Sequence, residues 1–295
     1  MSKVYFLPVG EADCFVLALD TPEGQRIVLI DGGGMEDRRI DLPAWLRTHG
    51  MEAVDLMILT HLHEDHLGGL PEVAAQLTVH RAVLPVPPFG ISEEQTTAPV
   101  EGEKEYRRGD LRQYDRMWTA LTGQGTGIST LFPMETAPVF RLGDYTLSCL
   151  SPLPGERSRV RERMGDLTSL TSAEISARRV AVEPYVNAES AVFLLEKGGE
   201  QLILFCADCE ASAIDRAMAA RPLHPRVLKL SHHGRNSNGR ISYTAEQVRA
   251  LAPETIVVTY APYKSPDQRE TWAAIDPRAQ LLITGDSPDG LVLEI

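Results

Sequence analysis

Four side chains of the kinds that bind metal ions lie within six consecutive positions of this sequence. They are His61, His63, Asp65 and His66, and two glycines, Gly68 and Gly69, follow. Imidazole and carboxylate groups together suit zinc, iron or manganese, and two such ions about 3.5–4 Å apart form a common hydrolytic centre. His61 and His63 can converge on one ion while Asp65 and His66 face a second. The spacing therefore predicts a site for two metal ions.

The histidine loop lies between an expected strand and an expected helix. Residues 55–59 are apolar and bounded by turn-forming residues, a pattern typical of a buried strand. Residues 70–77 are expected to form a helix with Pro71 in its first turn. An earlier expected strand, 26–30, ends in Asp31 and three glycines, which allow close backbone approach. We expect Asp31 beside the loop, accepting a hydrogen bond from a ligating histidine. A simple tight turn is the alternative.

Two later strand ends carry the remaining candidate ligands. Asp208 follows the expected strand 201–205, and its carboxylate can bridge two cations or cap the helix expected at 210–220. His232 and His233 follow the expected strand 227–230. Adjacent residues usually point in different directions, so one should ligate the second ion and the other should face the substrate as a hydrogen-bond donor or general acid. We assign His232 to the ion and His233 to the substrate, with the opposite order as the alternative.

Composition excludes several classes of protein. The chain has 295 residues and a net charge of −12, which disfavours broad non-specific binding to nucleic acid. No apolar run of about 18 residues exists, so we expect no membrane span. The sequence opens without a signal-peptide pattern and has few cysteines, so we expect a cytoplasmic, reducing location. Four cysteines are too few for a disulfide framework, and Cys206-x-x-Cys209 lacks the second pair of a zinc motif. An alternating run, Arg157, Arg159, Arg161 and Arg163, is either solvated surface or a patch that receives an anionic substrate.

Strands and helices alternate in both halves of the chain. This rhythm predicts an α/β (α+β) fold of four layers, with two sheets packed face to face and helices outside. We expect a single domain over residues 1–295, with insertions near 89–110 and 155–186. The first insertion is polar and charged, and the second contains the arginine run and a helix.

Taken together, these residues resemble the metallo-β-lactamase fold superfamily, most closely the soluble hydrolase domain of ComEC-type DNA-uptake proteins. The resemblance rests on Phe6 to Asp13, on the histidine loop, on Asp208, and on the run from Leu228 to Gly234. It implies an αββα sandwich with the metal site at its edge. Many members place a third histidine on the first ion, but no histidine lies between His80 and His224 here. Asn187 and Ser190 stand at about that place, which leaves open coordination that favours manganese over zinc.

The function that we expect is that of a metal-dependent hydrolase with two divalent ions. The ions would be zinc or manganese, with iron as an alternative, and the substrate a phosphodiester in an anionic small molecule or single-stranded nucleic acid. Asp65 would orient the attacking water and His233 would act as the catalytic donor. Asn187, Ser190 and Lys229 are candidate substrate contacts. Alternatives on the same fold are a lactone, thioester or β-lactam hydrolase, an iron redox protein, and a non-catalytic binding protein.

Overall fold

Two sheets of seven strands each run through the computed structural model, which describes residues 1–34, 40–101, 106–236, 240–261 and 268–295. The strand order of the first sheet is β14 (Leu291–Glu294), β1 (Lys3–Phe6), β2 (Phe15–Thr21), β3 (Gly24–Ile30), β4 (Ala53–Ile58), β5 (Thr78–Leu84) and β6 (Gly127–Thr130). That of the second is β13 (Gln280–Ile283), β12 (Thr255–Val258), β11 (Val227–Lys229), β10 (Glu200–Phe205), β9 (Val192–Lys197), β8 (Tyr145–Ser151) and β7 (Val139–Leu142).

Each sheet is parallel in one half and antiparallel in the other. Strands β3 to β6 are parallel neighbours in the first sheet, and β10 to β13 are parallel neighbours in the second. Ligands of open α/β sheets bind beyond the carboxyl ends of parallel strands. The histidine loop follows β4, Asp208 follows β10, and His232 and His233 follow β11. All the predicted ligands therefore come from carboxyl ends of parallel strands.

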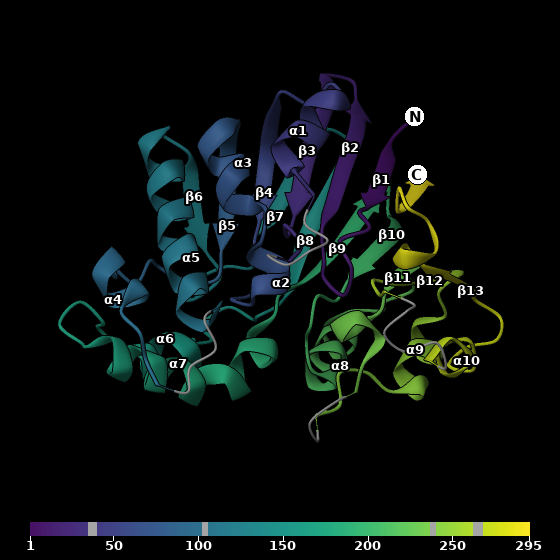
Figure 1. Ribbon diagram of the computed structural model, residues 1–295. Coiled ribbons are helices and arrows are strands. Elements are labelled where there is room, and N and C mark those ends of the chain that lie inside the picture. The colour runs from purple at the N-terminus through teal and green to yellow at the C-terminus, as the bar shows by residue number, and fades with distance from the viewer. Residues whose placement is uncertain (35–39, 102–105, 237–239, 262–267) are drawn as a thin grey trace.

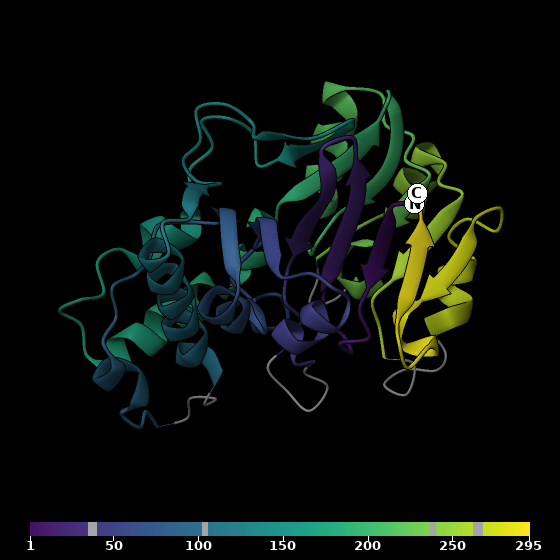
Figure 2. The same ribbon diagram turned by 90° about the horizontal axis from the view of Figure 1, so that it is seen from above.

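Helices cover the outer faces of the two sheets, so the predicted four-layer αββα fold is confirmed (Figures 1 and 2). The first sheet carries α1 (Leu42–Thr48), α3 (Leu70–Gln76) and α5 (Tyr106–Gly123). The second carries α8 (Ala211–Ala220), α9 (Ala245–Leu251) and α10 (Gln268–Ala273). Helices α6 (Arg159–Met164) and α7 (Ser172–Val186) lie at the lower edge in Figure 1, with α4 (Glu93–Thr97) above them at the left and α2 (Glu64–Leu67) near the centre of the molecule.

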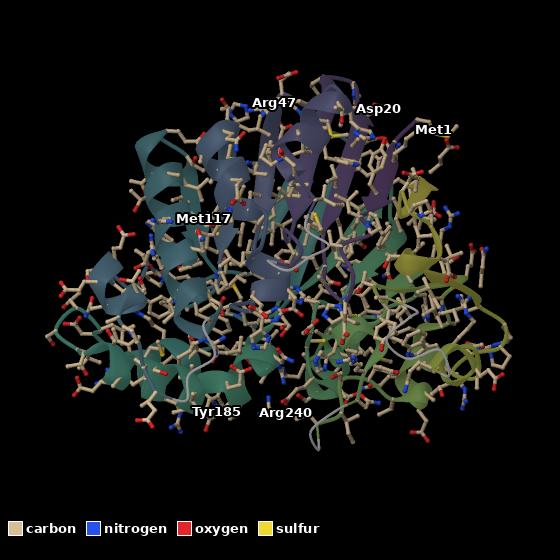
Figure 3. All side chains as sticks on the ribbon, viewed as in Figure 1. Met1, Asp20, Arg47, Met117, Tyr185 and Arg240 are labelled. Atoms are coloured by element: carbon tan, nitrogen blue, oxygen red, sulfur yellow. The ribbon has the colours of Figure 1, made fainter. Side chains whose placement is uncertain are left out.

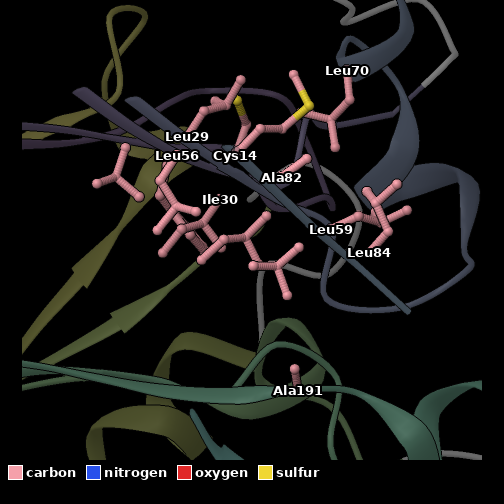
Figure 4. Close-up of a cluster of buried hydrophobic side chains, with 14 of the residues drawn as sticks. Cys14, Leu29, Ile30, Leu56, Leu59, Leu70, Ala82, Leu84 and Ala191 are labelled. Carbon is pink, nitrogen blue, oxygen red and sulfur yellow. The ribbon is translucent and has the colours of Figure 1, made fainter. Parts of the chain in front are cut away.

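Apolar side chains hold the two sheets together. The ring of Phe15 on β2 lies 5.3 Å from that of Phe205 on β10, and Phe6 on β1 packs 5.1 Å from Phe15. Figure 4 shows another part of the same core, with Leu56 and Ile30 in the first sheet on the side that faces Ala191, just before β9. Burying a phenylalanine contributes roughly 1.5–3 kcal/mol, so this layer fixes how the two carboxyl edges meet.

The two segments that we expected to be insertions contain more helix than the sequence pattern predicted. The segment 89–110, of which 102–105 lie outside the described residues, includes α4 and the first turn of α5. Both α4 and α7 begin with a capping box, formed by Ser92 with Gln95 and by Thr171 with Glu174. Strand β5 begins at Thr78 rather than Arg81, because the parallel pairing with β4 starts there. Within the described residues, no helix combines the length and apolar character needed to span a membrane.

Two glycine-containing loops are in close contact beside the predicted metal site. The amide of Gly32 donates to the carbonyl of His66 over 2.6 Å, and that of Gly69 donates to Gly32 over 2.8 Å. A Cβ atom on Gly68 would lie 2.1 Å from the carbonyl oxygen of Gly33, a distance that no side chain can occupy. Glycine at position 68 is therefore required for the histidine loop to dock.

We predict that Gly68→Ala destabilises the protein by about 1–3 kcal/mol, because the added methyl group forces the two loops apart. Urea unfolding of the purified variant measures the effect. Gly109→Ala in α5 is the matched control, since a Cβ atom there meets none of the described atoms within 4 Å. The control should be neutral or stabilising by about 0.5–1 kcal/mol. Equal unfolding midpoints for the two variants would contradict the close loop contact.

Candidate metal centre

The Asp208 carboxylate lies between two groups of imidazoles. Its Oδ2 atom is 4.0 Å from His61 Nε2 and 3.8 Å from His232 Nε2. Its Oδ1 atom is 3.3 Å from His66 Nε2 and 3.5 Å from His233 Nε2. Asp208 is 1% exposed, so these rings and not solvent are its environment. Each oxygen therefore faces a separate group of nitrogen atoms.

The first group consists of His61, His63 and Asp208. His61 Nε2 and His63 Nδ1 point at each other over 3.2 Å. Because residues i and i+2 of the loop face the same side, the two rings can offer one nitrogen each to a common ion. The side chain of His63 is 17% exposed, whereas His61 is 2% exposed.

The second group consists of Asp65, His66, Asp208 and His233. His233 Nε2 is 3.3 Å from Asp65 Oδ2, and it completes a ring of contacts with Asp208 and His66. The Asp65 side chain remains 31% exposed, while His66 and His233 are buried. Asp65 therefore lies on the side of this group that is open to solvent.

A hydrogen-bond chain through Asp31 orients two of the rings. His66 Nδ1 lies 2.8 Å from Asp31 Oδ2, and the hydroxyl of Thr60 donates to the same oxygen over 2.8 Å. Since the Thr60 hydroxyl donates to Asp31, it can accept from His61 Nδ1, 3.1 Å away. Both rings then carry a proton on Nδ1 and leave Nε2 free for a metal ion.

A second chain orients His233 in the same way. His233 Nδ1 lies 2.9 Å from the Thr259 hydroxyl, which donates to Asp13 Oδ1 over 2.6 Å. Asp13 also forms a fully buried ion pair with Lys229, whose ammonium group donates to the carbonyl of Ala207 over 3.0 Å. The free nitrogen of His233 is again Nε2, the atom that faces Asp208 and Asp65.

The site loops adopt strained backbone conformations. Asp31, Ala207, His232 and His233 have φ angles of 57°, 44°, 50° and 51°, in the left-handed region that side chains rarely occupy. The His232 amide donates to the Ala207 carbonyl over 2.9 Å, which ties the loop after β11 to the Asp208 loop. Such strain at several converging loops is typical of functional sites.

Charge is coupled strongly across the centre. Burial alone would raise the pKa of Asp208, but the rings of His233 and His66 hold it well below its usual range. Burial alone would lower the pKa of His66, but Asp208 and Asp31 raise it well above its usual value. Burial and the neighbouring imidazoles lower the pKa of His61, which keeps that ring neutral and its lone pair available. The carboxylates of Asp208 and Asp31 therefore favour a positive charge on the group that lies between them.

These residues fit divalent cations. In the described part of the chain, Asp208 Oδ1, His66 Nε2 and His233 Nε2 are buried atoms that have no hydrogen-bond partner. Buried polar groups are normally paired, so three that converge on one point indicate a missing ligand. Oxygen and imidazole nitrogen atoms in this arrangement suit zinc, manganese or iron. A third group, Asp13, Asp31 and His66, differs because Thr60 and Lys229 already occupy its oxygens.

His232 and His233 lie on opposite sides of the Asp208 carboxylate. His233 joins the buried second group, whereas His232 lies near the first group and is 19% exposed. His232 Nδ1 contacts the Ser242 hydroxyl at 3.1 Å, and its Nε2 lies 3.4 Å from the amide nitrogen of Asn187. The left-handed turn at both residues aims the two rings at opposite oxygens of Asp208.

The three candidate substrate contacts have different surroundings. Asn187 adjoins His232, and its Oδ1 atom is buried without a hydrogen-bond partner among the described residues. The Ser190 hydroxyl is also buried without a partner in that part of the chain. Lys229 is fully buried and paired with Asp13, so it faces the interior and not a substrate. This corrects the expectation for Lys229, because its strand directs it between the sheets.

Several supporting residues were missed by the sequence analysis. Thr60, Ser242 and Thr259 hold rings through hydroxyl groups, and no spacing rule marks a single threonine or serine. The sequence signal for Asp13 was its place in the run from Phe6 to Asp13, which carries part of the family resemblance. Glu183 on α7 lies 3.3 Å from His63 Nε2, and it comes from an insertion whose packing the sequence pattern did not predict.

Comparison with known proteins gives a partial family match and a shared fold. Residues 7–89 match the family model described as the metallo-beta-lactamase superfamily. No curated protein matches the sequence. Among solved structures, the metallo hydrolase Igni18 from the archaeon Ignicoccus hospitalis is 14% identical with a TM-score of 0.52, and the match covers 100% of both chains. A mutant of CmlA beta-hydroxylase is 14% identical with a TM-score of 0.51, and the match covers 100% of this chain and 54% of that one.

The family model covers residues 7–89 and shows a resemblance of that segment to the metallo-beta-lactamase superfamily. The identities are low, so the two structures show a shared fold and not a shared reaction. The resemblance to the ComEC-type subgroup stays a prediction.

We predict that Asp208→Ala and His233→Ala each lower the metal content of the purified protein, whereas His232→Ala retains it. Asp208 contacts both groups and His233 belongs to the second, but His232 is only a neighbour of the first. Elemental analysis by mass spectrometry, with circular dichroism to check folding, measures this. Loss of metal from His232→Ala together with full occupancy in His233→Ala would restore the original assignment.

Proposed function

We propose that this protein is a metal-dependent hydrolase that uses two divalent ions and acts on phosphodiesters. The observation that carries the proposal is the division of ligand atoms between the two oxygens of Asp208. His61 and His63 would hold the first ion with Oδ2, and Asp65, His66 and His233 would hold the second with Oδ1. Two ions in such a site activate water and offset charge on phosphoryl oxygens.

The residues at the open side of the centre have separate tasks. Asp65 is the most exposed member of the second group, so its carboxylate is placed to orient the attacking water as well as to ligate. His232 is partly exposed beside Asn187, so its ring takes the substrate-side role first given to His233. As a donor to the leaving oxygen it would contribute about 10²–10⁴ in rate. Asn187, whose Oδ1 atom has no hydrogen-bond partner among the described residues, adjoins this ring and is the remaining candidate contact, whereas Ser190 is fully buried.

Part of the arginine run supports an anionic substrate. Arg159 and Arg163 lie one helical turn apart on α6, exposed and 5.8 and 4.7 Å from the centre of the Tyr185 ring. Tyr185 precedes Asn187 by two residues, and Figure 3 shows it at the lower edge of the molecule, with Asp20 and Arg47 at the opposite end. Arg157 pairs instead with Glu162 over 2.7 Å, and Arg161 lies over the Phe89 ring. We assign anion capture to Arg159 and Arg163.

Iron-dependent oxidation is the second candidate, because the same imidazole and carboxylate groups suit iron. The CmlA protein, described as a beta-hydroxylase, shares the fold with a TM-score of 0.51. Its likeness concerns the fold alone, so the choice between the two reactions depends on experiment.

The test is a substrate panel on protein stripped of metal and then loaded with manganese, zinc or iron(II). We expect manganese or zinc to restore cleavage of bis(p-nitrophenyl) phosphate or single-stranded DNA. Asp208→Ala should lower the rate of that cleavage at least about 10³-fold, since Asp208 belongs to both groups of ligands. Cleavage of nitrocefin or a lactone alone would move the assignment to another hydrolase. Oxygen consumption with iron(II) and no hydrolysis would favour oxidation.

We predict that replacing both Arg159 and Arg163 with glutamine raises KM for single-stranded DNA and flattens its salt dependence. Each lost phosphate contact removes roughly 0.7 from the slope of log affinity against log salt concentration. A small phosphodiester should be affected much less, because it reaches only the metal centre. Arg157→Gln is the control, since Arg157 is paired with Glu162. Identical salt slopes for the double variant and the control would show that the arginines are solvated surface.

A further inference from the structure

His63 is held differently from the other imidazoles of the centre. His61, His66, His232 and His233 each use Nδ1 for an outer hydrogen-bond partner and direct Nε2 toward Asp208. His63 is reversed, because its Nδ1 faces His61 Nε2 over 3.2 Å. Its Nε2 atom is buried and has no hydrogen-bond partner within the described ranges. This ring therefore needs an acceptor on its Nε2 side.

The Glu183 carboxylate lies at that side. Glu183 Oε1 is 3.3 Å from His63 Nε2, an ion-pair distance without the alignment of a hydrogen bond. Glu183 belongs to α7, far along the chain from the histidine loop, so the contact joins an insertion to the metal centre.

Two buried residues fix the position of Glu183. Its other oxygen, Oε2, accepts a hydrogen bond from Arg179 Nη1 over 2.6 Å. Arg179 is 4% exposed, and its Nη2 atom is 3.5 Å from Asp110 Oδ2 on α5. Burial raises the pKa of Asp110 to about 8, and Arg179 only partly opposes this. Arg179 therefore holds the Glu183 carboxylate from one side while His63 lies at the other.

We infer that Glu183 is a positioning residue for the first metal ion. Its carboxylate accepts the proton on His63 Nε2, which leaves the Nδ1 lone pair free and aimed at the point that His61 also faces. Arg179 and Asp110 keep the carboxylate in place, so docking of α7 against α5 sets the affinity of the first ion. The inference rests on the proposed two-ion centre, and it adds a residue from the insertion to that centre.

The experiment compares wild type, Glu183→Ala, Glu183→Gln and Glu162→Gln. Glu162 is the matched control, because it is a charged residue on the neighbouring helix α6 that pairs only with Arg157 among the described contacts. Metal-free protein is titrated with zinc in competition with a chromophoric chelator, and separately with cobalt(II), whose visible spectrum reports ligand geometry. Circular dichroism melting checks that each variant is folded.

We expect Glu183→Ala to lower the affinity for one of the two ions by about 10–100-fold, as loss of an outer hydrogen-bond partner typically does. Only the cobalt(II) ion bound at that position should change its spectrum. The affinity of Glu183→Gln should fall less, since its amide oxygen still accepts a hydrogen bond. This variant provides the test if the alanine variant does not fold. Affinities and spectra of both variants that equal those of Glu162→Gln would overturn the inference. Wild-type protein that binds no ion would instead refute the proposed function itself.

Discussion

The buried carboxylate of Asp208 is the constraint on which the rest of the centre depends. It is 1% exposed and faces imidazole nitrogens on both sides, and it is too deeply buried to be stabilised by water. A buried charge of this kind is tolerated only when it is paired or bound to a cation. The loops that supply the pairing atoms come from β4, β10 and β11, so the face-to-face packing of the two sheets is what brings them together.

Rings that converge on one carboxylate must also be fixed in orientation. The Thr60 hydroxyl donates to Asp31, and the Thr259 hydroxyl donates to Asp13. Because each hydroxyl has given its proton to a carboxylate, it can only accept a hydrogen bond from the histidine ring beside it. Lys229 balances the charge of Asp13 in the core. The centre is therefore built as an inner set of ligand atoms with an outer set of hydrogen bonds that selects which nitrogen faces inward.

Much of this arrangement could be predicted from the sequence, for definite reasons. The four-layer fold followed from the alternation of strands and helices, and ligand spacing in the histidine loop indicated two converging pairs. The choice between His232 and His233 could not be predicted, because it depends on left-handed backbone angles at both residues. Lys229 was misplaced since an alternating pattern does not show which face of a short strand meets the other sheet. Glu183 depends on how α7 packs, which no local pattern encodes.

The most direct measurement is a crystal structure of the metal-loaded protein with anomalous scattering data collected at the absorption edge of the bound metal. The account predicts two anomalous peaks, one between Asp208 Oδ2 and the rings of His61 and His63, and one between Asp208 Oδ1 and the rings of His66 and His233. A single peak, or peaks among Asp13, Asp31 and the Nδ1 side of His66, would contradict it.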